Sequence, residues 1–272
     1  MLKISILTLS FNQAEFLEQC IDSVLSQSYP NWELIILDPG SSDSSREIAA
    51  RYANLDGRIR INFEKDQGPS DGLNKGLSLC SGEIIGCLNS DDYYRHGVFH
   101  EVAKAFLKYG EADCVYSHGS IMESGSTRFQ TSDLFSISRY FSNRGLVLQQ
   151  STFFRKSSLD RMKMSFNIEN GSSWDGEFLL DLAAKNANFQ RVFGNWGVFR
   201  IYPTSITGSQ RLKDKSEKDH LRMYKSHAKV NLLSQISRRI LLKVPIYSMF
   251  RRVRNLIFFW LWSLYHHFNK VL

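Results

Sequence analysis

Short apolar runs alternate with helical patterns over the first 90 residues. Apolar runs at residues 3–9, 32–37, 58–63 and 84–88 end in polar or turn residues, as buried strands do. Between the first two runs, Leu17, Cys20, Ile21 and Val24 recur at helical spacing. Strands that alternate with helices predict an α/β fold whose central sheet is mostly parallel.

Polar side chains follow each of these predicted strands. Residues 8–12 close the first strand, Asp38 the second, Asp66 comes after the third, and residues 89–92 (Asn-Ser-Asp-Asp) close the fourth. The carboxyl ends of parallel strands meet at one edge of an α/β sheet, where such sheets bind ligands. We therefore expect these polar residues to converge on one site.

The segment 82–92 is the centre of this expected site. Asp91 and Asp92 are adjacent carboxylates that repel each other, and a divalent cation is the simplest way to satisfy both. A polar turn or a helix N-cap is the alternative interpretation of these residues taken alone. Carboxylates after three of the four strands favour a site for a metal and a polar ligand.

Residues 96–150 carry fewer signals. The apolar positions in residues 98–106 predict a helix, and residues 113–117 predict another strand. A turn at Gly125 indicates a hairpin, and residues 133–144 are expected to form a loop.

The length of 272 residues suits one large domain, or one domain with an appendage. Residues 220–272 contain ten Lys or Arg and no Asp or Glu, which gives this tail a formal charge of +10. The whole chain carries +7, so residues 1–219 carry −3 and the body is mildly acidic. That split argues against a uniformly basic protein that binds nucleic acid.

The four cysteines have no CxxC spacing, which indicates reduced core residues of a cytoplasmic protein rather than a disulfide frame or a zinc site. The first residues form a strand-like run with no signal-peptide cleavage site.

The tail alternates basic pairs with apolar segments and contains the run Leu-Ile-Phe-Phe-Trp-Leu-Trp-Ser-Leu-Tyr at 256–265. This run is too short to span a bilayer, but basic turns beside an aromatic face are typical of a helix in the membrane interface. We expect residues 213–272 to contact an anionic membrane surface, at the inner face of the cell membrane. Packing on the domain, or an oligomer contact, is the alternative.

The motifs in combination resemble those of the family 2 glycosyltransferases. They are Thr-x-Ser-x-Asn at residues 8–12, Leu-Asp-x-Gly-Ser-x-Asp at 37–43, Asn-Lys-Gly at 74–76 and Gly-Glu-Ile-Ile-Gly-x-Leu-Asn-Ser-Asp-Asp at 82–92. The resemblance covers about residues 2–210 and implies the nucleotide-diphosphosugar transferase fold called GT-A. It implies a domain at residues 1–212, with a nucleotide-binding half at 1–95 and an acceptor half at 96–212.

The resemblance also implies roles for residues of the first half. Asp38 would recognise the base, and Asp91 would hold Mn²⁺ or Mg²⁺ at the diphosphate. Asn89 replaces the first carboxylate of the family's DxD motif and would face the ribose, because an amide still bonds to hydroxyl groups. The other residues implied to bind the nucleotide sugar are Thr8, Ser10, Asn12, Asp66, Ser90 and Asp92.

In the second half, Gln150 matches a family position near the transferred sugar, and Gln149 replaces the usual His. Asp175 matches the general base that deprotonates the acceptor, and Glu177 is a second, weaker catalytic candidate. The alternative for both is a helix first turn, which favours acidic residues. Tyr202 stands where the family has a His that helps to bind metal or diphosphate.

The resemblance therefore predicts inverting, metal-dependent transfer of a sugar from a UDP-hexose or UDP-N-acetylhexosamine. The acceptor would be a glycan or a polyprenyl-linked molecule in surface polysaccharide biosynthesis. Asn89 and Tyr202 leave open a scaffold that binds nucleotide sugars without turnover. A nucleotidyltransferase of related fold ranks third, because no Gly-rich basic loop follows the first strand.

Overall fold

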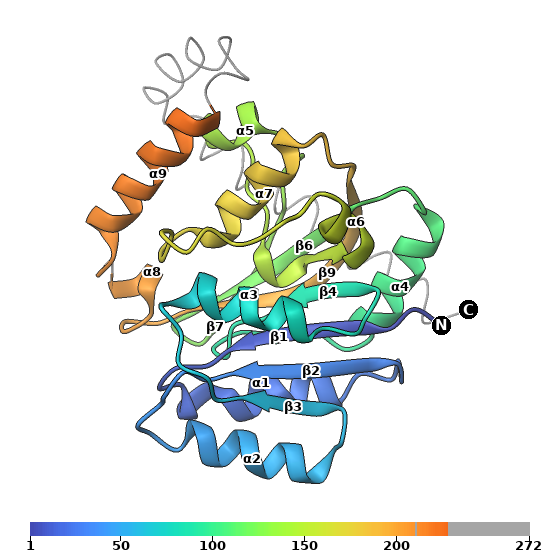
Figure 1. Ribbon diagram of the computed structural model, residues 1–272, viewed down its shortest axis with the longest axis vertical. Helices are drawn as coiled ribbons and strands as arrows, with labels where there is room; N and C mark the ends of the chain where they lie inside the picture. The colour runs from blue at the N-terminus through green and yellow to red at the C-terminus, as the bar shows by residue number, and fades with distance from the viewer. Residues whose placement is uncertain (210, 228–272) are drawn as a thin grey trace.

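The computed structural model describes residues 1–209 and 211–227. Within these residues the chain forms one nine-stranded sheet in the order β3-β2-β1-β4-β8-β6-β9-β5, with β7 paired to β6 (Figure 1). The strands are β1 Ile4–Leu9, β2 Trp32–Leu37, β3 Ile59–Asn62, β4 Ile84–Cys87, β5 Tyr93–Tyr94, β6 Cys114–Glu123, β7 Ser126–Gln130, β8 Thr152–Arg155 and β9 Phe189–Ile201.

The first half of the sheet is parallel, as the alternating pattern predicts. β1 pairs with β2 and β4, and β2 pairs with β3, all in parallel. The connecting helices are α1 Ala14–Leu25, α2 Ser45–Leu55 and α3 Pro69–Leu79. One core cluster joins the inner faces of α1, α2 and α4 (Val98–Lys108) to the sheet, and a second cluster joins α3, α6 (Lys156–Arg161) and α7 (Trp174–Ala184) to its other face.

The second half of the sheet is mixed. β8 lies between β4 and β6 and is antiparallel to both, whereas β9 runs parallel to β6. Gly86 of β4 pairs with Phe153 of β8, and a Cβ at this glycine would lie 2.7 Å from the Phe153 ring. The missing side chain therefore lets this aromatic ring pack against the centre of the sheet.

The remaining elements cover the second half. They are α5 Ile137–Phe141, the 3₁₀ turn η1 Gln149–Ser151, α8 Ile206–Ser209 and α9 Lys213–His227. The predicted hairpin at Gly125 is confirmed by the antiparallel pair β6–β7. The loop expected at residues 133–144 instead contains α5, whose first turn is capped because the Ser136 hydroxyl accepts a bond from the Arg139 N–H.

Helix α9 packs on the domain beside α5 and α7 (Figure 1). Met223 of α9 is buried in an apolar cluster with Ile137, Phe141 and Leu180. The expected boundary at residues 212 and 213 thus comes just before a helix that contacts the domain, and the division into two parts stays a prediction.

Of the tail predicted to contact a membrane, residues 213–227 form α9, and residues 228–272 with the aromatic run lie outside the described residues. In the part of the chain that the structure covers, no helix combines the length and the apolar character needed to cross a membrane. All four cysteines are buried and unbridged, as the sequence predicted.

Candidate functional site

The carboxyl ends of the parallel strands meet at a pocket of about 420 Å³. Ser10 follows β1, Asp66 follows β3, and Asn89, Ser90 and Asp91 follow β4, and all five line this cavity. We name it the donor pocket after the role that the resemblance implies for these residues. The convergence expected from the sequence is therefore present for these five residues.

A second pocket of about 250 Å³ adjoins the first, and we name it the acceptor pocket after the role that the resemblance implies for Asp175. Residues 146–150, Asp175 and Arg200 line it. Five residues line both pockets and form the wall between them: Asn89, Asp91, Trp174, Ser205 and Ile206. Asp91 therefore lies where the two cavities meet, whereas Asp175 lines only the second.

The Asp91 carboxylate interacts with the segment that follows β9. The Tyr202 hydroxyl lies 3.1 Å from Asp91 Oδ2 and 3.3 Å from Gln13 Oε1. Burial raises the pKa of Asp91, and the Tyr202 hydrogen bond acts against that rise. Burial and the negative charge of Asp91 raise the pKa of Tyr202 to about 12, so its hydroxyl is a neutral donor at pH 7.

Asp92 is buried and lines neither pocket. Its Oδ1 accepts a bond of 2.8 Å from the Arg200 N–H, and its Oδ2 accepts one of 2.6 Å from Gln150 Nε2. Burial, together with the charge of Asp91, raises the pKa of Asp92 well above its usual value. Asp92 thus joins β9 and η1 to the end of β4, and its contact with the nucleotide sugar stays a prediction. Gln150 lines the acceptor pocket, but its amide nitrogen is bonded to Asp92.

Three further predicted residues lie behind the pocket wall. Thr8 is fully buried in β1. Asp38 accepts bonds from the N–H groups of Gly40 and Ser41 at 3.0 and 2.8 Å, so its carboxylate holds the turn after β2. Asn12 has a φ of +53° and accepts a bond of 2.8 Å from the Ser42 N–H. Asp38 and Asn12 hold the loop after β2 through these bonds, and none of the three residues lines the donor pocket.

Asp175 lies in the first turn of α7 and is half-buried. It lines the acceptor pocket and also a chamber of about 10 Å³ beside that pocket. Burial raises the pKa of Asp175, although backbone N–H groups at the start of the helix act against this rise. A carboxylate with a raised pKa in a pocket is a suitable proton acceptor.

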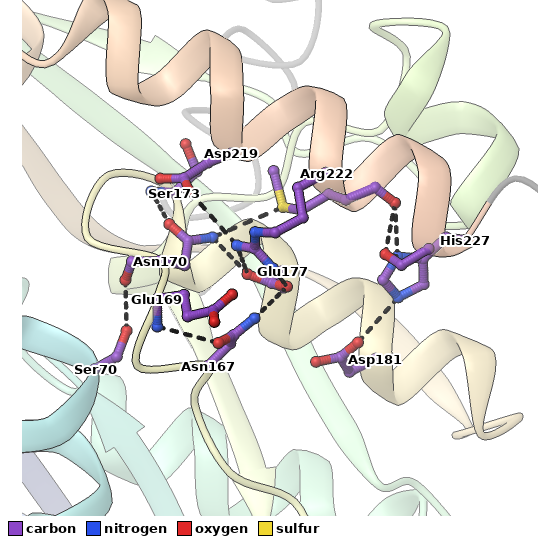
Figure 2. Close-up of polar contacts among 12 residues, drawn as sticks. Ser70, Asn167, Glu169, Asn170, Ser173, Glu177, Asp181, Asp219, Arg222 and His227 are labelled. Atoms are coloured by element: carbon purple, nitrogen blue, oxygen red, sulfur yellow. Dashed lines mark hydrogen bonds and ion pairs between the residues drawn. The ribbon is translucent and has the colours of Figure 1, made fainter.

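Glu177 lies in the same first turn of α7 but faces α9 (Figure 2). The Arg222 guanidinium donates to both of its oxygens at 2.5 and 2.8 Å, and Asn167 and Asn170 donate to them at 3.0 and 2.7 Å. Burial would raise the pKa of Glu177, but these hydrogen bonds and the Arg222 charge lower it. Glu177 lines neither pocket, so its geometry fits a structural ion pair between α7 and α9 rather than the weaker catalytic role expected for it.

Sequence reasoning missed several residues of the donor pocket. Phe11 lines this pocket although its side chain is 58% exposed, and Gln13, Trp174 and Arg211 line it as well. Phe11 lies between two residues that were expected in the site, so an exposed aromatic residue at a strand end was an available signal. Arg211 belongs to the segment between α8 and α9, and no sequence spacing indicates that this segment returns to the pocket.

The acidic residues do not form a metal cage by themselves. In residues 1–209 and 211–227, no group of three His, Cys, Asp or Glu side chains could hold a metal ion. Mg²⁺ and similar cations bind to one or two carboxylates and complete their shell with phosphate oxygens and water. The half-buried Asp91 carboxylate, in the wall shared by the two pockets, fits a cation of this kind, which needs the ligand's phosphates.

Comparison with known proteins identifies the family. Residues 5–167 match the family model described as "Glycosyl transferase family 2". The chain belongs to glycosyl transferase family 2. Among curated family members, the putative teichuronic acid biosynthesis glycosyltransferase TuaG of Bacillus subtilis is 32% identical over 115 residues, which are 42% of this chain and 44% of TuaG. The uncharacterized glycosyltransferase alr2836 of Nostoc sp. is 25% identical over 249 residues, 87% of this chain and 68% of that protein.

Solved structures confirm the GT-A fold expected for this family. TarS 1–349 of S. aureus in complex with UDP-GlcNAc has a TM-score of 0.61 at 19% identity, covering 75% of this chain and 60% of that one. The mannosyltransferase PcManGT of Pyrobaculum calidifontis, in complex with GDP-Man and Mn²⁺, has a TM-score of 0.61 at 15% identity, covering 94% of this chain and 80% of that one. In the sequence comparison, the match to this chain spans less than half the length of TuaG.

The position of Asp92 generates a stability prediction. In Asp92→Asn, one oxygen that accepts a hydrogen bond becomes an NH₂ group facing another donor, so the free energy of unfolding should fall by about 1–3 kcal/mol. Thermal or urea unfolding measures this loss. Asp160→Asn, the same change at an exposed carboxylate, is the control and should have little effect. An Asp92→Asn protein of wild-type stability that no longer binds nucleotide would restore the ligand role for Asp92.

Proposed function

We propose that this protein is an inverting, metal-dependent glycosyltransferase that moves a sugar from a nucleotide-diphosphate sugar to an acceptor hydroxyl. The observation that carries the proposal is the shared wall of the two pockets. Asp91 lies in that wall, and Asp175 lines the acceptor pocket but not the donor pocket. This arrangement separates a group that holds the leaving diphosphate from a base that activates the acceptor.

The donor pocket suits a nucleoside diphosphate. Phe11, Leu37 and Pro39 offer an apolar surface to the base, and Asn89 and Asp66 offer acceptors for ribose hydroxyls. Asp91 would hold Mn²⁺ or Mg²⁺ against the diphosphate, and Arg211 adds a positive charge to the same pocket. A bound divalent cation stabilises the negative charge that develops on the leaving diphosphate. The complex of TarS with UDP-GlcNAc supports a UDP-hexose or UDP-N-acetylhexosamine as the donor.

In the acceptor pocket, Asp175 removes the proton of an acceptor hydroxyl. The hydroxyl oxygen forms a bond to the anomeric carbon as the bond from that carbon to the diphosphate oxygen breaks. A single displacement from the face opposite the leaving group inverts the anomeric configuration, and the nucleoside diphosphate leaves with the electron pair. Such a displacement needs one group on each side of the sugar. Asp91 would act at the leaving diphosphate, and Asp175 would act at the attacking hydroxyl.

The biological setting is proposed from the relatives. The name of TuaG refers to teichuronic acid biosynthesis, which supports a role in surface polysaccharide synthesis with a glycan or polyprenyl-linked acceptor. A place at the inner face of the cell membrane, reached through the basic tail after residue 227, would bring the enzyme to such an acceptor.

Removal of the Asp91 carboxylate tests the metal role. Asp91→Ala should weaken Mn²⁺-dependent binding of a nucleoside diphosphate by at least about 10- to 100-fold, because the cation loses its protein ligand. Calorimetric titration of UDP and GDP with and without Mn²⁺ measures the change. Asp160→Asn should bind like the wild type, and unchanged affinity in Asp91→Ala would remove Asp91 from the proposed site.

Removal of the base tests transfer itself. Asp175→Asn should keep nucleotide binding but reduce the rate of transfer by about 10²–10⁴-fold. In the wild type, the rate should fall as the pH drops through the Asp175 pKa, because only the deprotonated carboxylate accepts a proton. Since burial raises that pKa, this acid limb should lie above the pH at which an ordinary Asp titrates.

The control for this experiment is Asp181→Asn, at a carboxylate on the outer part of α7 that bonds to His227. Near-normal transfer by Asp175→Asn would overturn the base assignment. A wild-type protein that binds nucleotide sugars but neither transfers nor hydrolyses any of them would favour the scaffold instead, with Tyr202 covering Asp91.

A further inference from the structure

Gln149 has a fixed orientation at the start of η1. Its Nε2 donates a hydrogen bond to the carbonyl oxygen of Cys87, the last residue of β4. The nitrogen of a Gln amide is a donor only, and its oxygen is an acceptor only, so the bond decides which end contacts the strand. Oε1 is therefore the amide atom that is left to interact with a ligand in the cavities that Gln149 lines.

This oxygen has no donor within the part of the chain that the structure describes. Gln149 Oε1 is buried and without a hydrogen-bond partner there. Buried acceptors in proteins nearly always have a partner. The Thr152 hydroxyl lines the same small chamber but donates to the Leu148 carbonyl oxygen at 2.8 Å. Oε1 is therefore available to a donor on a molecule that enters the pocket.

Gln149 and Asp175 line the same two cavities. Both border the acceptor pocket of about 250 Å³, and both border the chamber of about 10 Å³ beside it. The rest of the chamber wall is mostly aromatic and aliphatic, including Phe166, Trp174 and Phe178. The chamber has room for about one water molecule or one hydroxyl group. Two acceptor groups that border one small space suit a ligand with two neighbouring O–H donors.

We propose that Gln149 accepts a hydrogen bond from the hydroxyl next to the one that reacts, so that the acceptor is a sugar ring with a free vicinal diol. This inference rests on the proposed function, in which Asp175 takes the proton of the reacting hydroxyl. A sugar carried on a lipid satisfies the requirement, whereas a lipid phosphate or a simple alcohol lacks the second donor. Gln149 thereby selects the acceptor, and it also fixes the reacting hydroxyl against Asp175.

The probes are methyl hexopyranosides and their deoxy analogues, each lacking one ring hydroxyl. Their binding to the full chain, saturated with UDP or GDP and Mn²⁺, is measured by ligand-observed NMR. The variants are Gln149→Met, which keeps the side-chain length without the amide, and Gln149→His, whose neutral ring has one donor and one acceptor nitrogen. Gln190→Met is the matched control, because Gln190 is a half-buried glutamine of β9 that lines neither pocket.

We expect the wild type and Gln190→Met to bind at least one methyl hexopyranoside. Gln149→Met should bind the same sugar about 10-fold more weakly, and Gln149→His should recover most of the affinity. Loss of the adjacent hydroxyl from the ligand should weaken binding to the wild type but not to Gln149→Met. This non-additivity indicates a direct contact, because a merely structural effect of the substitution would leave the two losses additive.

Equal binding of the pyranosides by the wild type and Gln149→Met would overturn the inference, and so would the absence of pyranoside binding to the nucleotide-saturated wild type. Different results would overturn the proposed function itself. They are that UDP and GDP with Mn²⁺ do not bind the wild type, or that they bind Asp91→Ala equally well.

Discussion

The site depends on the different environments of two adjacent carboxylates, Asp91 and Asp92. Two neighbouring charges at the end of a buried strand repel each other unless each has its own partner. Asp92 is buried and takes its hydrogen bonds from the Arg200 N–H and from Gln150. Asp91 is left at the pocket wall, where the Tyr202 hydroxyl is its side-chain partner among the described residues. One carboxylate therefore holds the architecture, and the other is available to a ligand.

The same division applies to the acidic pair on α7. Glu177 is neutralised by Arg222 and surrounded by Asn167 and Asn170, so it stabilises the packing of α9 on the domain (Figure 2). Breaking a buried pair of this kind by removing one partner is costly, which keeps the start of α7 in place. Asp175 has no ion pair within the described chain and faces a pocket instead. In both pairs, the structure separates a carboxylate that supports the fold from one that faces the cavities.

The sequence predicted the first half of the fold well, because its strands are continuous apolar runs bounded by turns. It predicted the edge where Ser10, Asp66, Asn89 and Asp91 converge for the same reason. It did not predict that β8 inserts antiparallel between β4 and β6, because a four-residue strand carries no sign of its neighbours. Contacts between residues far apart in the sequence could not be predicted either. No local pattern indicates that the Arg200 backbone N–H bonds to Asp92, that Arg222 pairs with Glu177, or that Arg211 lines the donor pocket.

The central claim is that the nucleotide and the cation bind together at Asp91. Thermal unfolding of the wild type with Mn²⁺ alone, with a nucleoside diphosphate alone, and with both tests it most directly, since ligands that bind only the folded state stabilise it. We expect UDP or GDP together with Mn²⁺ to raise the midpoint by more than the sum of the separate shifts, and we expect the nucleoside without phosphates to lack this effect. Purely additive shifts, or an equal effect of the nucleoside, would contradict it.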